Sequence, residues 1–328
     1  MASITAIHWA GFTAFVLLAL ALDLGLFHRH GRKVGFREAL VWTGVWAASA
    51  MAFAFWVAPR AIPGWGPAHG ATFVTGYLVE LSLSMDNVFV MACIFRFFAV
   101  PSAWQHRVLF WGILGALAMR GIMIGAGAVI IHRVHAVLYV MGAFLIYTGS
   151  RMMFAGDGGD SIEPERNPVV KMVRRFFPMA AAFDGESFTT RRAGRWLLTP
   201  LALVLVMVET TDVVFALDSI PAIFGVTQDA FLVFTSNVFA ILGLRSLYFV
   251  LASAMGYFTL LKYGLSLVLV FIGGKMLAEP WLKPWLGDSL MNLSIGIVVA
   301  ILLISMIASL VFGRREAQAM TVAPEERN

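Results

Sequence analysis

Cysteine is almost absent from the sequence, and this absence excludes several kinds of site. The only cysteine is Cys93, so neither an intramolecular disulfide nor a paired-cysteine motif for zinc or thiol redox chemistry can form. Charged residues are scarce as well. They make up 13% of the 328 residues, whereas soluble domains carry about 25%. This composition excludes a water-soluble enzyme, a disordered chain and a collagen-like chain.

Catalytic motifs are missing too. The seven histidines lie near the ends of apolar runs or between them, and no HExxH, GxSxG or Ser–His pattern occurs inside a run. We therefore expect no enzymatic activity, no permanently bound cofactor, and no path specialised for Zn²⁺ or Cu⁺. The formal net charge of +5 does not point to nucleic acid, because the excess Lys and Arg of membrane proteins gather in cytoplasmic loops.

Apolar residues are abundant: 60% of the chain is hydrophobic and the mean hydropathy is +0.82. A transmembrane helix needs about 20 mostly apolar residues. Nine runs meet this requirement: 7–27, 39–58, 73–99, 108–131, 135–154, 198–222, 230–251, 260–278 and 289–312. The sequence thus predicts an all-α polytopic membrane protein with about nine transmembrane helices and the lipid bilayer as its solvent.

One long polar segment, 155–197, separates the fifth run from the sixth. Its Gly, Pro and mixed charges predict a cytoplasmic linker, in which KMVRRFFPM could form a short amphipathic helix on the membrane surface. We divide the chain into an N-terminal two-helix segment 1–72, a first transmembrane repeat 73–154, the loop 155–197, a second repeat 198–278, and a ninth helix with a cytoplasmic tail 279–328.

The distribution of Lys and Arg predicts the orientation. Alternate loops, together with the tail after 312, hold eighteen of these cations, and the other loops hold four: Arg60, Arg133, Lys275 and Lys283. Because positive loops stay inside, we expect the N-terminus outside and the C-terminus in the cytoplasm. The remaining two cations, Arg120 and Arg245, fall within spans.

The third and sixth runs resemble each other. VELSLSMDNVF aligns with TDVVFALDSIP, which places Glu80 on Asp212, Asp86 on Asp218 and Asn87 on Ser219. The similarity continues downstream and places Arg120 on Arg245, Gly149 on Gly273 and Arg151 on Lys275. A three-helix unit contains an odd number of spans, so its second copy must enter the membrane from the opposite side. This pattern predicts two inverted three-helix repeats with a binding site near the midplane.

Six acidic residues fall within the spans, and ionised groups there cost about 2.5–3.5 kcal/mol each: Asp23, Glu80, Asp86, Glu209, Asp212 and Asp218. Five of the six lie in the two equivalent runs. In a purely structural alternative these acids pair with Arg120 and Arg245 to hold the bundle together, but two arginines cannot neutralise five acids. Asp23 could instead reach water at the end of its span, and Asn237 could serve helix packing.

Carboxylate, amide and hydroxyl oxygens form a hard site that suits Ca²⁺, Mg²⁺ or Mn²⁺. Candidate metal ligands are Glu80, Asp86, Asn87, Glu209, Asp212 and Asp218, with Asp23, Arg120, Ser219, Asn237 and Arg245 in support. Met85 and Met207 could favour Mn²⁺. A proline at 221 could break the sixth span and add carbonyl ligands. Some acids should be protonated without a bound cation, so metal entry would release protons.

Four stretches together resemble the TerC/Alx family of bacterial integral membrane proteins: LDLGLFHR, SLSMDNVFV, ETTDVVFALDSIPAIFGVTQDAFLVFTSNVFAILGLRSLYF and LKYGLSLVLVFIGGKML. The resemblance covers roughly residues 10–312 without the central loop. It implies a multi-pass protein of the bacterial cytoplasmic (inner) membrane, with LysE-superfamily-like inverted repeats. It also implies a link to tellurite resistance and to manganese efflux, with the six candidate ligands forming the metal path.

The leading expectation is therefore a transporter that exports a divalent metal, foremost Mn²⁺, in exchange for protons. A Ca²⁺/proton exchanger and a membrane factor that delivers metal to exported metalloproteins remain alternatives. A membrane redox modulator is disfavoured by the lone Cys93. Association into a homo-oligomer stays open.

Overall fold

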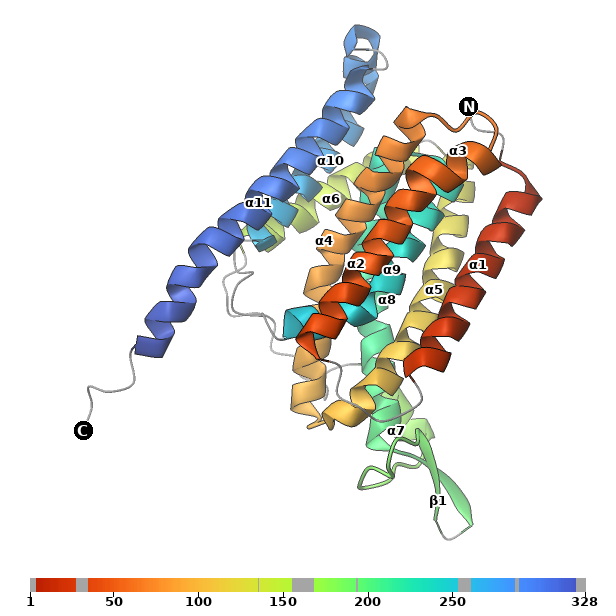
Figure 1. Ribbon diagram of the computed structural model, residues 1–328, viewed down its shortest axis with the longest axis vertical. Helices are drawn as coiled ribbons and strands as arrows, with labels where there is room; N and C mark the ends of the chain where they lie inside the picture. Colours follow the sequence, from red (N-terminus) through yellow and green to blue (C-terminus); the bar gives the residue numbers. More distant parts are fainter. Residues whose placement is uncertain are drawn as a thin grey trace.

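The computed structural model describes residues 4–27, 35–134, 136–154, 168–192, 194–252, 261–286 and 289–322. Helices dominate this part of the chain (Figure 1). The helices of the bundle are α1 (Ala6–Phe27), α2 (Phe36–Ala52), the π-helical turn η1 (Phe53–Val57), α3 (Ala58–Ala61), α4 (Pro67–Phe97), α5 (Ser102–Arg133), α6 (Ala136–Phe154), α8 (Pro200–Val226), α9 (Ala230–Ala252), α10 (Leu261–Leu286) and α11 (Ser289–Val322).

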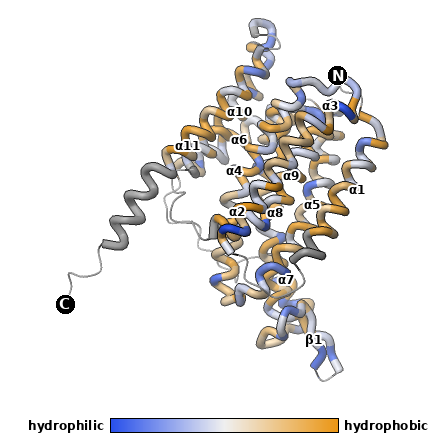
Figure 2. Tube along the Cα trace, viewed as in Figure 1, coloured by the Kyte–Doolittle hydropathy of each residue, from blue (hydrophilic) through white to orange (hydrophobic). Residues whose placement is uncertain are grey.

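Among the described residues, eight helices are long and apolar enough to cross a membrane, and α1 contributes a shorter apolar stretch, Ala6–Leu22. The second of the predicted spans corresponds to α2, η1 and α3, which follow one another without a break from Phe36 to Ala61. The expectation of an all-α polytopic membrane protein is confirmed. Figure 2 shows hydrophobic residues along the helices of the bundle and hydrophilic ones at its two ends, around α7 and β1 and around α3.

Two helices continue where the sequence analysis expected an interruption. α8 runs through Pro221 to Val226, so the expected break at this proline is wrong. α10 runs through Pro280 and Pro284 to Leu286. Lys275, which is counted above among the loop cations although it falls near the end of the predicted run 260–278, lies within α10. Neighbouring helices satisfy the backbone groups that a membrane-embedded proline frees, so proline need not end such a helix.

The centre of the bundle is formed by four helices. α4 and α5 each pack against both α8 and α9. Of the eight spans among the described residues, α9 is the most enclosed, with 89% of its apolar stretch buried. α2 and α1 cover α9 from outside, and α11 covers α10 and α4. One end of the bundle carries α7, and we name it the α7 end; the opposite end carries α3, and we name it the α3 end (Figure 1).

α6 and α10 cross at very close range. A Cβ on Gly142 would lie 3.0 Å from the carbonyl oxygen of Gly273, and a Cβ on Gly149 would lie 2.8 Å from that of Ser266. Glycine allows this approach because it has no side chain. When Gly149 is aligned with Gly273, Gly142 falls on Ser266, so each of these two contacts is the counterpart of the other.

The described part of the segment between α6 and α8 is folded, whereas the sequence predicts a linker with at most a short helix at KMVRRFFPM. It contains α7 (Pro168–Phe176) and a hairpin of β1 (Thr189–Arg192) and β2 (Arg195–Leu198), paired antiparallel from Thr189↔Leu198 to Arg192↔Arg195. Val170 is buried against α8, and the Trp104 ring of α5 lies 5.5 Å from that of Phe183. Strands this short and polar show no apolar alternation, so their sequence is typical of a loop.

Candidate cation site

The guanidinium of Arg120 lies at the centre of the bundle and joins two helices. Arg120 projects from α5 and is 1% exposed. Its Nη2 donates to Asp212 Oδ1 at 2.9 Å and its Nε donates to Asp212 Oδ2 at 3.3 Å, so one edge of the guanidinium binds both oxygens of this carboxylate of α8. Its Nη1 donates to Glu80 Oε1 of α4. Two acids that the repeat alignment places on each other thus share one arginine.

Three smaller polar side chains extend this cluster. Ser84 donates to Glu80 Oε1 at 3.3 Å, and Asn87 Nδ2 donates to Asp212 Oδ1 at 3.4 Å. Ser219 Oγ accepts from Arg120 Nη1 at 3.5 Å. Positions 80, 84 and 87 share one face of α4, and 212 and 219 share one face of α8, because four- and seven-residue steps return to the same side of a helix. We call these six residues, Arg120 included, the Arg120 cluster.

The charges of the Arg120 cluster do not cancel. Two carboxylates against one guanidinium leave a formal charge of −1 when both acids are ionised. Glu80 is 0% and Asp212 is 3% exposed, so this charge lies away from water, where each buried ion carries a desolvation cost of several kcal/mol. A cation or a proton arriving at these oxygens would relieve the imbalance.

Several buried polar atoms of the central helices have no hydrogen-bond partner within the described part of the chain. They are Glu80 Oε2, Asn87 Oδ1 and both amide atoms of Asn237 on α9. Buried polar atoms are nearly always paired with protein, water or an ion. The two free oxygens of the Arg120 cluster are therefore donors that an incoming cation can use.

The other predicted ligands lie elsewhere. Glu209 is half-buried and its carboxylate fills the space over Gly115 of α5, where a Cβ would collide with it. Asp218 is also half-buried, one helical turn from Val214, which is 58% exposed. Within the described residues Asp218 does not join the Arg120 cluster. The side chains of Asp86 and Asp23 lie outside the described part of the structure.

No group of three or more His, Cys, Asp or Glu side chains gathers at metal-binding range among the residues that the structure describes. The Arg120 cluster supplies two carboxylates, and its further oxygen donors are amide and hydroxyl groups. Oxygen ligands of this kind are those of hard divalent cations. The purely structural alternative, in which Arg120 holds the helices together, also accounts for the ion pairs of Arg120 with Glu80 and Asp212.

A small cavity adjoins the Arg120 cluster on the side of the α7 end. Asp212 and Arg245 line it with Gly112 of α5, Met91 of α4 and Val208 of α8. Met91 and Val208 lie closer than the cluster to the α7 end of their helices. Sequence reasoning missed Met91 and Gly112, since a methionine and a glycine in an apolar run carry no signal of a cavity.

Comparison with known proteins agrees with the fold. The chain is 47% identical over 319 residues to the uncharacterized membrane protein STKORF319 of Myxococcus xanthus, covering 97% of this chain and 96% of that protein. It is 45% identical over 281 residues to the putative membrane-bound redox modulator Alx of Escherichia coli K12, covering 83% and 86%. An uncharacterized membrane protein of Rickettsia felis is 34% identical over 303 residues, covering 92% and 97%. No solved structure matches the chain.

The model of the family described as "Integral membrane protein TerC family" matches residues 65–317, which span α4 to α11 and include the whole Arg120 cluster. The relatives cover nearly all of the chain at high identity. The chain therefore belongs to the TerC family of integral membrane proteins.

Proposed function

We propose that the chain exports a divalent cation, foremost Mn²⁺, across the bacterial cytoplasmic membrane in exchange for protons. The observation that carries this proposal is the Arg120 cluster, in which Glu80 and Asp212 are buried with an excess negative charge. Buried ionisable residues inside a membrane protein are expensive and usually mark an ion pathway.

In this proposal Arg120 acts as a tethered counter-cation. It neutralises one of the two carboxylates of Glu80 and Asp212 while the site is empty of metal. An arriving divalent cation takes the free oxygens Glu80 Oε2 and Asn87 Oδ1 together with Asp212. The added positive charge weakens the hold of Arg120 on the carboxylates, because like charges repel in a low dielectric.

The cavity beside Asp212 supports loading from the α7 end. Glu209 lies one turn from Asp212 toward this end and is half-buried, so it is placed to carry the exchanged proton. The cation asymmetry of the loops favours a cytoplasmic position for the α7 end. Under this orientation the cavity faces the compartment from which an exporter takes its cargo.

Oxygen donors alone do not separate Mn²⁺ from Ca²⁺. The thioether of Met91 lines the cavity, and Met207 is buried nearby on α8. Sulfur is a softer ligand that Ca²⁺ avoids, so these residues favour Mn²⁺. A Ca²⁺/proton exchanger is the alternative of the same class.

Two inverted copies of one unit would provide alternating access to a site between them. Three packing relationships support such a pseudo-two-fold arrangement: α4 packs on α8, α5 on α9 and α6 on α10. The reciprocal contacts of Gly142 and Gly149 across α6 and α10 fit the same axis. Inverted repeats rocking about a central site are common among secondary transporters.

The name of the Alx relatives suggests redox modulation as a function from another class. A thiol–disulfide cycle within one chain needs two cysteines, and this chain has one. A metal-delivery factor for exported metalloproteins remains the other alternative. It predicts that the exposed loops, and proteins bound to them, matter as much as the buried acids.

The decisive experiment measures Mn²⁺ flux in proteoliposomes that contain only this protein, with and without an imposed pH gradient. We expect flux that rises with the gradient and is at least tenfold lower for Zn²⁺. The Glu209→Gln variant should still bind Mn²⁺ but lose the response to the gradient. Wild-type flux that ignores the gradient contradicts antiport, and a wild type that moves no divalent metal contradicts transport itself.

A further inference from the structure

Lys275, counted among the loop cations in the sequence, is a cation within a helix of the bundle. It lies within α10, is half-buried, and donates from Nζ to the carbonyl oxygen of Gly225 at 3.0 Å. Gly225 is in the last turn of α8, which ends at Val226. The last carbonyls of a helix have no partner within the helix and carry its negative pole, so an ammonium ion is a fitting partner.

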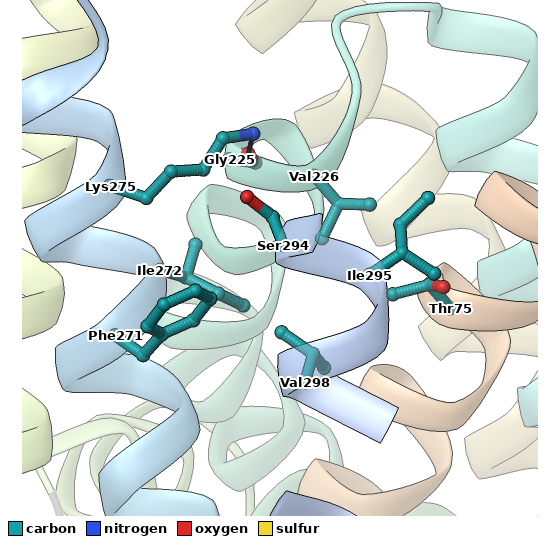
Figure 3. A pocket seen from close by; sticks show the side chains of 9 residues that line it. All are labelled: Thr75, Gly225, Val226, Phe271, Ile272, Lys275, Ser294, Ile295 and Val298. Carbon is teal, nitrogen blue, oxygen red and sulfur yellow. Dashed lines mark hydrogen bonds between the residues drawn. The ribbon is translucent and has the colours of Figure 1, made fainter. Parts of the chain in front are cut away.

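This bond closes one side of a small cavity. Lys275 and Gly225 line the cavity together with Thr75 of α4 and Ser294 of α11, at the meeting point of four helices. Figure 3 shows the Lys275 amine reaching across to Gly225 beside the Ser294 hydroxyl. The cavity volume of about 10 Å³ is close to the space that one water molecule needs.

The cavity lies on the other side of the Arg120 cluster from the cavity of Asp212. Thr75 precedes Glu80 by five residues on α4, which corresponds to about 7.5 Å toward the α3 end. Gly225 follows Ser219 by six residues on α8, which corresponds to about 9 Å in the same direction. The two cavities therefore flank the cluster along the direction in which a cation would cross.

At the α3 end, α8 and α10 are in close contact around the Lys275–Gly225 bond, and we call this contact the seal. A Cβ on Gly225 would collide with Ile272 and lie 2.8 Å from the sulfur of Met276, both on α10. α8 and α10 therefore touch through this glycine, and the Lys275 bond spans the same contact. The aligned cation of the first repeat, Arg151, is exposed on the last turn of α6. Among the described residues, the α7 end thus lacks the counterpart of this seal.

We infer that Lys275 is the gate at the α3 end of the pathway, an inference that rests on the proposed transport function. While its ammonium holds the Gly225 carbonyl, the exit is closed. A cation moving outward must displace this ammonium from the C-terminus of α8. The same positive charge repels cations that approach from outside while the bond is closed.

The test measures access to the cavity. In a Cys93→Ala background, Ser294→Cys places a single thiol in the cavity, and a membrane-impermeant maleimide is applied to the outside of spheroplasts. We expect slow labelling when Lys275 is present, at least tenfold faster labelling with Lys275→Met, and little change with Lys275→Arg. Lys283→Met, at an exposed position two turns further along α10, is the matched control and should label slowly.

Equal labelling of the Lys275→Met variant and its parent overturns the gate. A similar acceleration by Lys283→Met overturns it as well, because it would show a general loosening of α10. If Lys275→Met is not recovered in the membrane, Lys275→Gln, which is neutral and polar, carries the same expectation. The labelling readout is independent of any metal. If Lys275→Met labels fast but the wild-type protein moves no Mn²⁺, the role of Lys275 as a gate is supported and Mn²⁺ is rejected as the transported ion.

Discussion

Glu80 and Asp212, which occupy matching positions in two similar helices, hold the same guanidinium from opposite sides. Arg120 reaches Asp212 with Nη2 and Nε and reaches Glu80 with Nη1. The three side chains are almost fully buried. Any change of charge at one of them is therefore felt by the other two, since little water lies between to screen it.

We predict that Asp212→Asn abolishes Mn²⁺ flux in proteoliposomes. The change keeps the size of the side chain and removes the charge that pairs with Arg120. Removing one partner of a buried pair costs about 3–5 kcal/mol, although Glu80 remains to neutralise Arg120 and should reduce this cost. Glu186→Gln, which breaks a half-exposed pair with Arg107 at 4.0 Å, is the control and should keep both flux and thermal stability. An Asp212→Asn protein with normal flux would remove the Arg120 cluster from the pathway.

Arg120→Met should be the most damaging single change in the cluster. It leaves two carboxylates buried beside each other without a counter-ion, which should lower the melting temperature in detergent or prevent recovery of the folded protein. We expect the double variant Arg120→Met/Asp212→Asn to be more stable than Arg120→Met alone, because the second change removes one of the repelling charges. Melting temperatures of the two variants decide this, and a double variant that is less stable contradicts the charge argument.

Gly273→Val should separate α6 from α10. A side chain at this position would meet the backbone of Gly142 and the side chain of Ile146, and overpacking of this kind costs about 1–3 kcal/mol. Gly274→Val is a matched control on the same helix, since nothing lies within 4 Å of a Cβ there. Melting temperatures should fall for the first variant and stay near the wild type for the second. Equal melting temperatures of the two variants would contradict the close contact of α6 and α10 at Gly273.

The orientation of the chain can be read with single cysteines in a Cys93→Ala background. Arg191→Cys lies on the exposed hairpin at the α7 end, and Ala68→Cys lies exposed at the start of α4, at the α3 end. We expect an impermeant maleimide applied outside intact spheroplasts to label Ala68→Cys and to spare Arg191→Cys until the membrane is opened. The reverse pattern would invert the assignment of the cytoplasm and with it the direction of export.

Much of this protein could be predicted from the sequence because the constraint on a membrane-spanning chain is local. In hydrocarbon every backbone polar group must be satisfied within the segment, so a run of about 20 apolar residues becomes a helix. Among the described residues, eight of the nine predicted runs correspond to helices long and apolar enough to cross a membrane, and the first corresponds to the shorter apolar stretch Ala6–Leu22. The match of the family model confirms the TerC resemblance. The shared face of Glu80, Ser84 and Asn87 follows equally from the helical repeat.

Pairings between helices could not be predicted in this way. Five acids were candidate ligands, with Asp23 in support, and the structure brings Glu80 and Asp212 to Arg120 while Asp218 is half-buried outside the Arg120 cluster. Which side chains meet depends on the rotation and tilt of each helix, and those are set by packing against neighbours such as the Gly142–Gly273 crossing. The sequence by itself determined where the chain crosses the membrane. The tertiary structure decided which charges face each other and gave Lys275 its place on the end of α8, because ion pairs between distant helices form only where packing brings them within reach.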